Sequence, residues 1–213
     1  DITVYHAVPS LAGADFWTTV PVPRLGIPAV KVSDGPNGAR GAGGLTNGTP
    51  AAAFPCAIAL GASWNRDAAY EMGAALAAEA RSKGARVLLA PTVNMHRSGL
   101  NGRNFECYSE DPLLTSMLAV AYVKGLQDNG VGATIKHFVA NDSEIDRQTV
   151  SSDVDERTLR EIYLPPFEAA VKKAGVWAVM TGYNRLNGIH MDGHKWALQE
   201  VMRGEFGYDG IFM

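Results

Sequence analysis

The chain has 213 residues, of which 46% are hydrophobic and 19% are charged, and its formal net charge is −3. This composition is typical of a globular protein, and the length fits one large domain or two small ones. The sequence holds no cluster of Lys and Arg and no apolar stretch of about 18 residues, so we expect neither nucleic acid nor a membrane as a partner.

Short apolar segments alternate with segments of helical periodicity along the chain. The pattern predicts strands at 28–32, 56–60, 86–90, 131–135, 177–180 and 210–213, and helices at 65–83, 112–130, 155–173 and 194–203. The third helix contains Pro165 and Pro166, which must bend or restart it. Repeated β–α units with continuous apolar strands indicate a parallel sheet covered by helices.

Both a doubly wound sheet and a (β/α)8 TIM-like barrel fit this alternation. A doubly wound nucleotide-binding fold would need a glycine fingerprint between its first strand and helix. Gly41–Gly44 matches that fingerprint only weakly, because no helical pattern follows it, and we interpret it as a flexible loop. Barrel enzymes place their chemistry directly after the strands, which favours the barrel. Polar or aromatic residues occupy that place at Asp34, Trp64, 91–94, 136–137 and Tyr183.

The most informative segment is Lys136–Glu144, because an adjacent lysine and histidine follow the apolar residues 131–135. Successive strand residues point to opposite faces, so one basic side chain points inward or both lie at the end of the strand. An inward Lys or His needs a polar partner. The alternative is a strand that ends at Ile135 and is followed by two solvated basic residues.

Metal, disulfide and phosphate chemistry find little support in the sequence. The residues that bear on metal and thiol chemistry are His96, His137, His190, His194, Cys56 and Cys107. Because they are scattered and lack ligand spacing, we expect no metal, no cofactor and two unreactive buried thiols. The sequence also lacks a Gly-x-Ser-x-Gly elbow and a P-loop.

What remains is a set of charged groups suited to sugar hydroxyls, each of which both donates and accepts hydrogen bonds. Asp34 could instead be a turn residue before Gly-Pro, and Arg103 could instead form a surface ion pair with Glu106. Trp64 could be a stacking platform for a sugar, although a core tryptophan beneath the site is the favoured interpretation.

Six motifs occur in order over nearly the whole chain. They are Ser33–Pro36 with Arg40, Gly102–Glu106 with Ser109–Pro112, Lys136–Phe138 with Asn141, Glu144 and Arg147, Glu156–Phe167, Val179–Met180 with Tyr183–Asn184 and Asn187–Gly188, and Gly207–Gly210. Together these motifs resemble glycoside hydrolase family 3, in its β-glucosidase-like branch.

The resemblance implies a (β/α) barrel, often irregular or collapsed in this family, that is followed by an α/β sandwich domain. We therefore expect residues 1–213 to be the N-terminal part of the barrel, without the sandwich domain. The residues implied to bind the sugar are Asp34, Arg40, Arg103, Lys136, His137, Met180 and Tyr183. Those implied to orient them are Glu106, Asn141, Glu144 and Arg147.

The implied reaction is retaining hydrolysis that removes β-linked glucose from the non-reducing end of a glucoside or oligosaccharide, through a glycosyl-enzyme intermediate. The family nucleophile is an aspartate expected just after Met213, and the acid/base is expected in the following domain. Asp209 matches the turn before the strand and is not the nucleophile. By this resemblance neither catalytic carboxylate lies in the chain, and residues 1–213 alone are expected to be inactive.

Residues that differ between the branches of this family narrow the range of expected substrates. The hexosaminidase branch carries Pro-Gly-His after Lys-His-Phe, whereas this chain has Val139–Asn141. The xylosidase branch tends to carry Glu at the position of Asp34, and the shorter Asp leaves room for the 6-hydroxymethyl group of glucose. The alternatives are a catalytically inactive carbohydrate-binding barrel, and a β-xylosidase or glycoside phosphorylase of the same family.

Overall fold

The structure is a computed structural model that describes residues 15, 17–41 and 48–213, and its main feature is a parallel sheet. The sheet has five strands in the order β1-β2-β3-β5-β8, and all its neighbouring strands are parallel. These strands are β1 (Val32–Ser33), β2 (Val87–Leu88), β3 (Gly132–Phe138), β5 (Ala178–Thr181) and β8 (Ile211–Phe212).

The order of the strands in the sheet follows their order in the chain. A (β/α)8 barrel is built in this way, whereas a doubly wound sheet changes direction at a switch point. The α/β prediction with a parallel sheet is therefore confirmed. Within the described residues the sheet is open, and no closed barrel forms. Of the predicted flexible loop Gly41–Gly44, only Gly41 lies within the described residues.

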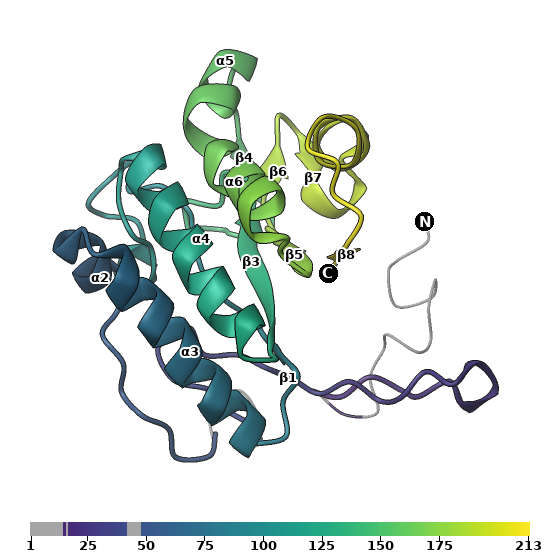
Figure 1. Ribbon diagram of the computed structural model, residues 1–213. Helices are drawn as coiled ribbons and strands as arrows, with labels where there is room; N and C mark the ends of the chain where they lie inside the picture. Colours follow the sequence, from purple (N-terminus) through teal and green to yellow (C-terminus); the bar gives the residue numbers. More distant parts are fainter. Residues whose placement is uncertain (1–14, 16, 42–47) are drawn as a thin grey trace.

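Helices connect the parallel strands. The α-helices are α2 (Ala57–Ser63), α3 (Arg66–Ser82), α4 (Pro112–Asp128), α5 (Glu156–Thr158) and α6 (Pro165–Ala174). The shorter or wider helical segments are η2 (Pro23–Leu25), η3 (Asn104–Glu106), η4 (Leu159–Tyr163), η5 (Met191–Gly193) and η6 (Trp196–Glu205). Figure 1 shows α3, α4 and α6 side by side over one face of the sheet, with β3 behind them.

The helix ends follow from local sequence. The side chain of Asn65 accepts hydrogen bonds from the first backbone N–H groups of α3, and the side chain of Asp111 does the same for α4. Pro112 occupies the first turn of α4, where its missing N–H costs nothing. The proline pair also restarts a helix as predicted, because η4 ends at Tyr163 and α6 begins at Pro165.

Strand β3 is the centre of the core, since all seven of its residues are buried. The ring of Phe138 at its end packs edge-on against Phe167 of α6, with 5.0 Å between ring centroids. On the helix side, Leu76 of α3 and Leu118 of α4 are fully buried. A strand covered on both faces reads as a continuous apolar run, which explains why residues 131–135 lack alternation.

The predicted strand at 56–60 is wrong, because these residues begin α2. Ala57, Leu60 and Gly61 are the buried residues of α2, and their spacing places them on one face of a helix. A short apolar run cannot be assigned by periodicity alone. Trp64 consequently follows a helix, caps it in the left-handed conformation and is 73% exposed, so its prediction as a core residue is also wrong.

A second, three-stranded sheet was not predicted from the sequence; it is formed by β4 (Ser151–Ser152), β6 (Arg185–Leu186) and β7 (Ile189–His190). Strands β6 and β7 form a hairpin whose two turn residues, Asn187 and Gly188, both have positive φ. Asn-Gly is the strongest short-range sequence signal for such a turn. The hairpin lies in the connection between β5 and η6 (Figure 1).

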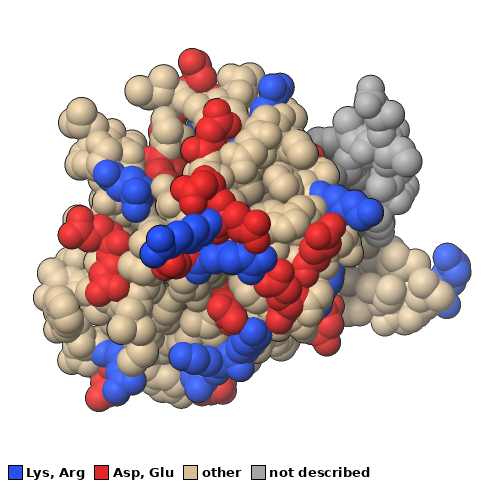
Figure 2. Space-filling view, turned by 90° about the horizontal axis from the view of Figure 1, so that it is seen from above, with Lys and Arg blue, Asp and Glu red and all other residues tan. Residues whose placement is uncertain are grey.

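Basic and acidic side chains are interspersed on the described part of the surface in Figure 2. Several of them form exposed ion pairs, such as Arg157 with Glu161 and Lys172 with Glu168. Within the described residues, no helix is both long enough and apolar enough to cross a membrane.

Candidate functional site

The predicted sugar-binding residues gather at the carboxyl ends of the parallel strands. Asp34 directly follows β1, and Lys136 and His137 lie within β3. The Nζ of Lys136 donates to Oδ1 of Asp34 at 2.9 Å. Lys136 is 3% exposed and His137 is 7% exposed. The interpretation of these two residues as solvated is therefore wrong, because β3 continues beyond Ile135 to Phe138.

The pKa of Asp34 reflects two opposed effects. Burial raises the pKa of the Asp34 carboxyl, while the charge and the hydrogen bond of Lys136 lower it. The pKa is lowered overall from its ordinary value, so Asp34 is ionised at neutral pH. A buried ammonium and a carboxylate that is 35% exposed thus form a fixed ion pair whose open side can accept a hydroxyl hydrogen.

His137 is held by Asn94, which follows β2. The side-chain amide of Asn94 donates to the backbone oxygen of His137 at 3.0 Å and accepts from its backbone N–H at 3.1 Å. The ring Nδ1 lies 3.3 Å from Oδ1 of Asn94, and the ring Nε2 lies 3.3 Å from Nη1 of Arg103. Because a guanidinium only donates, Nε2 accepts and Nδ1 carries the proton.

The His137 ring is neutral at physiological pH. Burial lowers its pKa well below the ordinary value, and the positive charges of Lys136, Arg103 and Arg147 lower it further. A neutral imidazole between an amide and a guanidinium orients its neighbours without adding charge to the site.

Arg103 joins two acidic residues to His137. Its Nε donates to Oε1 of Glu106, and its Nη1 lies 3.8 Å from Oε1 of Glu144. Glu106 is buried and accepts a further hydrogen bond of 2.9 Å from the hydroxyl of Thr92. Arg103 does pair with Glu106 as the alternative interpretation held, but the pair is anchored in the interior and is not a solvated surface contact.

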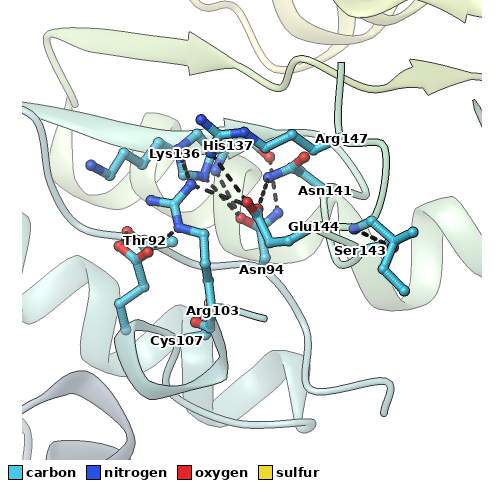
Figure 3. Close-up of polar contacts among 12 residues, drawn as sticks. Thr92, Asn94, Arg103, Cys107, Lys136, His137, Asn141, Ser143, Glu144 and Arg147 are labelled. Carbon is cyan, nitrogen blue, oxygen red and sulfur yellow. Dashed lines mark hydrogen bonds and ion pairs between the residues drawn. The ribbon is translucent and has the colours of Figure 1, made fainter. Parts of the chain in front are cut away.

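The four residues expected to orient the sugar-binding groups are found together. Glu144 accepts from Arg147 at 3.1 Å and from the amide of Asn141 at 3.5 Å. Figure 3 shows Arg103 and Arg147 both reaching toward Glu144. The guanidinium of Arg147 also lies over the ring of Tyr183, 5.1 Å from its centroid. These contacts place Tyr183 beside the cluster, with 59% of its surface exposed.

Arg40 and Met180 are connected to the other predicted site residues through the backbone. The backbone N–H of Arg40 donates to the backbone oxygen of Asp34 at 2.9 Å, and its guanidinium lies 5.9 Å from the ring centroid of Trp17. Met180 lies in β5 and pairs in register with Lys136, which sets it at the same level of the sheet.

Three residues of this region were not singled out as site residues from the sequence. Thr92 and Asn94 follow β2 and support Glu106 and His137. Asp142 lines a small hollow together with Arg103 and His137 and accepts from the backbone N–H of Met95 at 3.2 Å. Segment 91–94 was recognised from the sequence as polar residues after a strand, but no site role was assigned to Thr92 or Asn94.

Burial raises the pKa of Asp142 to about 6, against the hydrogen bonds of Tyr163 and Met95 and the charge of Arg97, which lower it. Burial also raises the pKa of the Cys107 thiol to about 12, so this thiol is unreactive as expected. Cys56 is a free thiol that is only partly buried. Within the described residues, no three His, Cys, Asp or Glu side chains are grouped to hold a metal ion.

The side chains of the candidate site together form a partly enclosed set of hydrogen-bond donors and acceptors. Three cations, Lys136, Arg103 and Arg147, each pair with an acidic side chain. The neutral imidazole of His137 lies beside Arg103. Such a set can bind several hydroxyl groups of one sugar ring in a defined orientation.

Residues 14–213 match the family model of the glycosyl hydrolase family 3 N terminal domain. Among curated proteins, a β-glucosidase from Rhizobium radiobacter is 65% identical over 212 residues, covering 100% of this chain and 26% of the relative. β-Glucosidase B from Emericella nidulans is 55% identical, and the match covers 100% of this chain and 25% of the relative. The chain thus spans about a quarter of the length of these curated relatives.

Solved structures of such enzymes match closely in three dimensions. β-Glucosidase 3B from Thermotoga neapolitana in complex with glucose has a TM-score of 0.87 at 49% identity, covering 92% of this chain and 28% of that one. A β-glucosidase from Kluyveromyces marxianus in complex with glucose has a TM-score of 0.92 at 48% identity, covering 96% of this chain and 25% of that one.

Proposed function

The chain belongs to glycosyl hydrolase family 3, and we propose that it supplies the sugar-binding side of a retaining β-glucosidase. The complete protein would remove β-linked glucose from the non-reducing end of glucosides or oligosaccharides. The observation that carries this proposal is the buried contact of Lys136 with Asp34 at the carboxyl ends of the strands. Similar proteins with the same fold are named β-glucosidases, and both solved structures described above contain glucose.

Each proposed sugar ligand has a distinct task. Asp34 accepts a hydrogen bond from a hydroxyl, while Lys136 and Arg103 donate to hydroxyl oxygens. His137, Arg40, Met180 and Tyr183 complete the walls of the site. Neighbouring side chains support Arg103 and Tyr183. Glu106 and Glu144 pair with Arg103, Asn141 and Arg147 bond to Glu144, and Arg147 lies over the ring of Tyr183.

Retaining hydrolysis needs two carboxyl groups on opposite sides of the glycosidic bond, one as nucleophile and one as acid and then base. Three acids of the cluster are ion-paired: Asp34 with Lys136, Glu106 with Arg103, and Glu144 with Arg147. Asp142 accepts hydrogen bonds from the backbone N–H of Met95 and from Tyr163. This engagement supports the proposal that the nucleophile is an aspartate just after Met213. The acid/base would come from an α/β sandwich domain that follows the barrel.

The proposal is tested on the complete polypeptide with a 2-deoxy-2-fluoro-β-glucoside. The fluorine slows breakdown of the glycosyl-enzyme, so the labelled peptide can be found by mass spectrometry. We expect a single label on an aspartate directly after Met213, and none on residues 1–213. An unlabelled protein that still binds glucose would instead support a carbohydrate-binding barrel without catalysis.

A further inference from the structure

Glu79 lies on α3, outside the proposed sugar site, and holds the loop that follows β1. Its Oε2 accepts from the backbone N–H of Ala39 at 2.7 Å, and its Oε1 accepts from the backbone N–H of Ala52 at 2.6 Å. One carboxylate therefore joins two points of the loop that are thirteen residues apart in the sequence. Hydrogen bonds to an ionised acceptor are stronger than neutral ones.

Lys83, one helical turn further on, binds the same loop through the other backbone polar group of Ala39. Its Nζ donates to the backbone oxygen of Ala39 and lies 3.6 Å from Oε1 of Glu79. The loop packs directly on this lysine, since a Cβ on Gly41 would lie 2.6 Å from Cδ of Lys83. Both backbone polar groups of Ala39 are thus bonded, the N–H to Glu79 of α3 and the oxygen to Lys83, which directly follows α3.

Ala39 is fully buried, and removing the Glu79 carboxylate takes away the acceptor that its N–H has in the structure. Leaving a buried backbone donor without a partner is costly, and the loop would move to satisfy it. Ala39 directly precedes Arg40, whose N–H donates to the backbone oxygen of Asp34 at 2.9 Å. A displacement of the backbone at Ala39 would therefore also move Asp34 and Arg40, the two proposed sugar ligands of this loop.

We propose that Glu79 is a positioning residue, which fixes Asp34 and Arg40 for the sugar by tying the two sides of their loop to α3. This inference rests on the proposed function. Glu79 touches no substrate itself and acts only through the backbone of Ala39 and Ala52. Small displacements of binding groups far from the reacting atoms are known to lower rates strongly.

The test compares Glu79→Ala and Glu79→Gln with the parent in the complete polypeptide, using 4-nitrophenyl β-glucoside as substrate and glucose as competitive inhibitor. We expect Glu79→Ala to lower kcat/KM about tenfold, the loss typical of one hydrogen bond to a charged group. Glucose affinity should fall by a similar factor. The kcat/KM and glucose affinity of Glu79→Gln should lie between those of the parent and those of Glu79→Ala, because glutamine keeps one acceptor oxygen.

Two controls separate positioning from general destabilisation. Glu71→Gln removes a charge from an exposed position of the same helix, and Leu76→Val weakens the buried face of that helix. Both should keep kcat/KM within about twofold of the parent. A Glu79→Ala or Glu79→Gln protein that retains parental kcat/KM and glucose affinity overturns the inference, as does an equal loss in Leu76→Val.

Hydrogen exchange gives a readout that does not depend on activity. Exchange at residues 37–41 and 48–54 should be faster in Glu79→Ala than in the parent and in Glu71→Gln. Unchanged exchange there overturns the inference. A parent protein that hydrolyses no β-glucoside overturns the proposed function instead, and the exchange comparison still decides whether Glu79 holds the loop.

Discussion

The Nζ of Lys136 lies 2.9 Å from Oδ1 of Asp34, across 102 residues of sequence. The pair joins strand β3 to the end of strand β1, with β2 between them in the sheet. Lys136 is 3% exposed and the side chain of Asp34 is 35% exposed. The contact therefore links two strands through a buried ammonium, while the carboxylate keeps an open side toward the proposed sugar site.

Lys136→Met should destabilise the protein, because it leaves the Asp34 carboxylate partly buried and without its cation. Breaking a fully buried pair costs roughly 3–5 kcal/mol, and the partial exposure of Asp34 lowers our expectation to about 2 kcal/mol. Lys172→Met is the matched control, since Lys172 pairs with Glu168 at 2.6 Å on the surface. Thermal unfolding should show a clear loss for the first variant and almost none for the second.

The same pair predicts a pH dependence. The folded pKa of Asp34 lies below its unfolded value, so its contribution to stability is present above about pH 4 and is lost as pH falls through the folded pKa. In Lys136→Met this acid-dependent contribution should disappear. Unfolding curves recorded between pH 3 and pH 7 for parent and variant would contradict this if they stayed parallel.

Arg103→Lys should impair catalysis in the complete protein while preserving the charge. A lysine cannot donate to Glu106, Glu144 and His137 from one planar group, so the orientation of the donor is lost. We expect kcat/KM to fall by roughly 10- to 100-fold, equal to about 1.5–3 kcal/mol of transition-state binding. Arg157→Lys, at an exposed pair with Glu161, is the control.

If Arg103→Lys changes kcat/KM by less than twofold, Arg103 does not bind the sugar in the transition state. A loss confined to thermal stability would likewise assign Arg103 a structural task in the pair with Glu106 alone. Steady-state kinetics at a temperature where both proteins are fully folded distinguishes these results.

Asp142→Asn should stabilise the protein at neutral and alkaline pH. Burial raises the folded pKa of Asp142 to about 6, so the native state binds more protons than the unfolded state between about pH 4 and pH 6. Its destabilising contribution therefore develops as pH rises through that window. We expect Asn to gain about 1–2 kcal/mol at pH 8 and little at pH 4.

The measurement is the free energy of unfolding at pH 4, 6 and 8. Asp209→Asn controls for the loss of one negative charge at an exposed position. An Asp142→Asn protein that is less stable than the parent at pH 8 would show that the ionised carboxylate, bonded to Met95 and Tyr163, is favourable in the fold.

Much of the fold could be predicted because its strongest signals are local. The Asn65 and Asp111 caps marked α3 and α4, and Pro165 marked the start of α6. Segment 56–60 could not be assigned, because four or five apolar residues fit a buried helix turn as well as a strand. Trp64 was misplaced for the same reason, since its position depended on that strand.

The sequence predicted which residues form the candidate site but not how they are arranged. The motifs identified Lys136, Arg103 and Glu144 as site residues, yet the sequence left open whether Lys136 was solvated. Burial is a property of the whole sheet, since β3 is enclosed only after β2 and β5 pair with it. Glu79 and Asp142 carry no motif, because they act on backbone groups whose position only the folded chain defines.

The contact between α3 and α4 leads to a last prediction. A Cβ on Gly125 of α4 would lie 2.1 Å from the backbone oxygen of Tyr70 of α3, so Gly125→Ala must push the helices apart. Overpacking of this kind costs about 1–3 kcal/mol. Activity should fall as well, because the hydroxyl of Tyr122 on α4 donates to the backbone oxygen of Pro36, two residues after Asp34.

Gly204→Ala is the matched control for this change. A Cβ there would lie no closer than 3.4 Å to another atom, and alanine favours a helix over glycine by about 1 kcal/mol. The Tm and the kcat/KM of the complete protein should both fall for Gly125→Ala. For Gly204→Ala, the Tm should stay level or rise and kcat/KM should stay level. If Gly125→Ala lost stability but kept full activity, the position of α4 would not control the loop that carries Asp34.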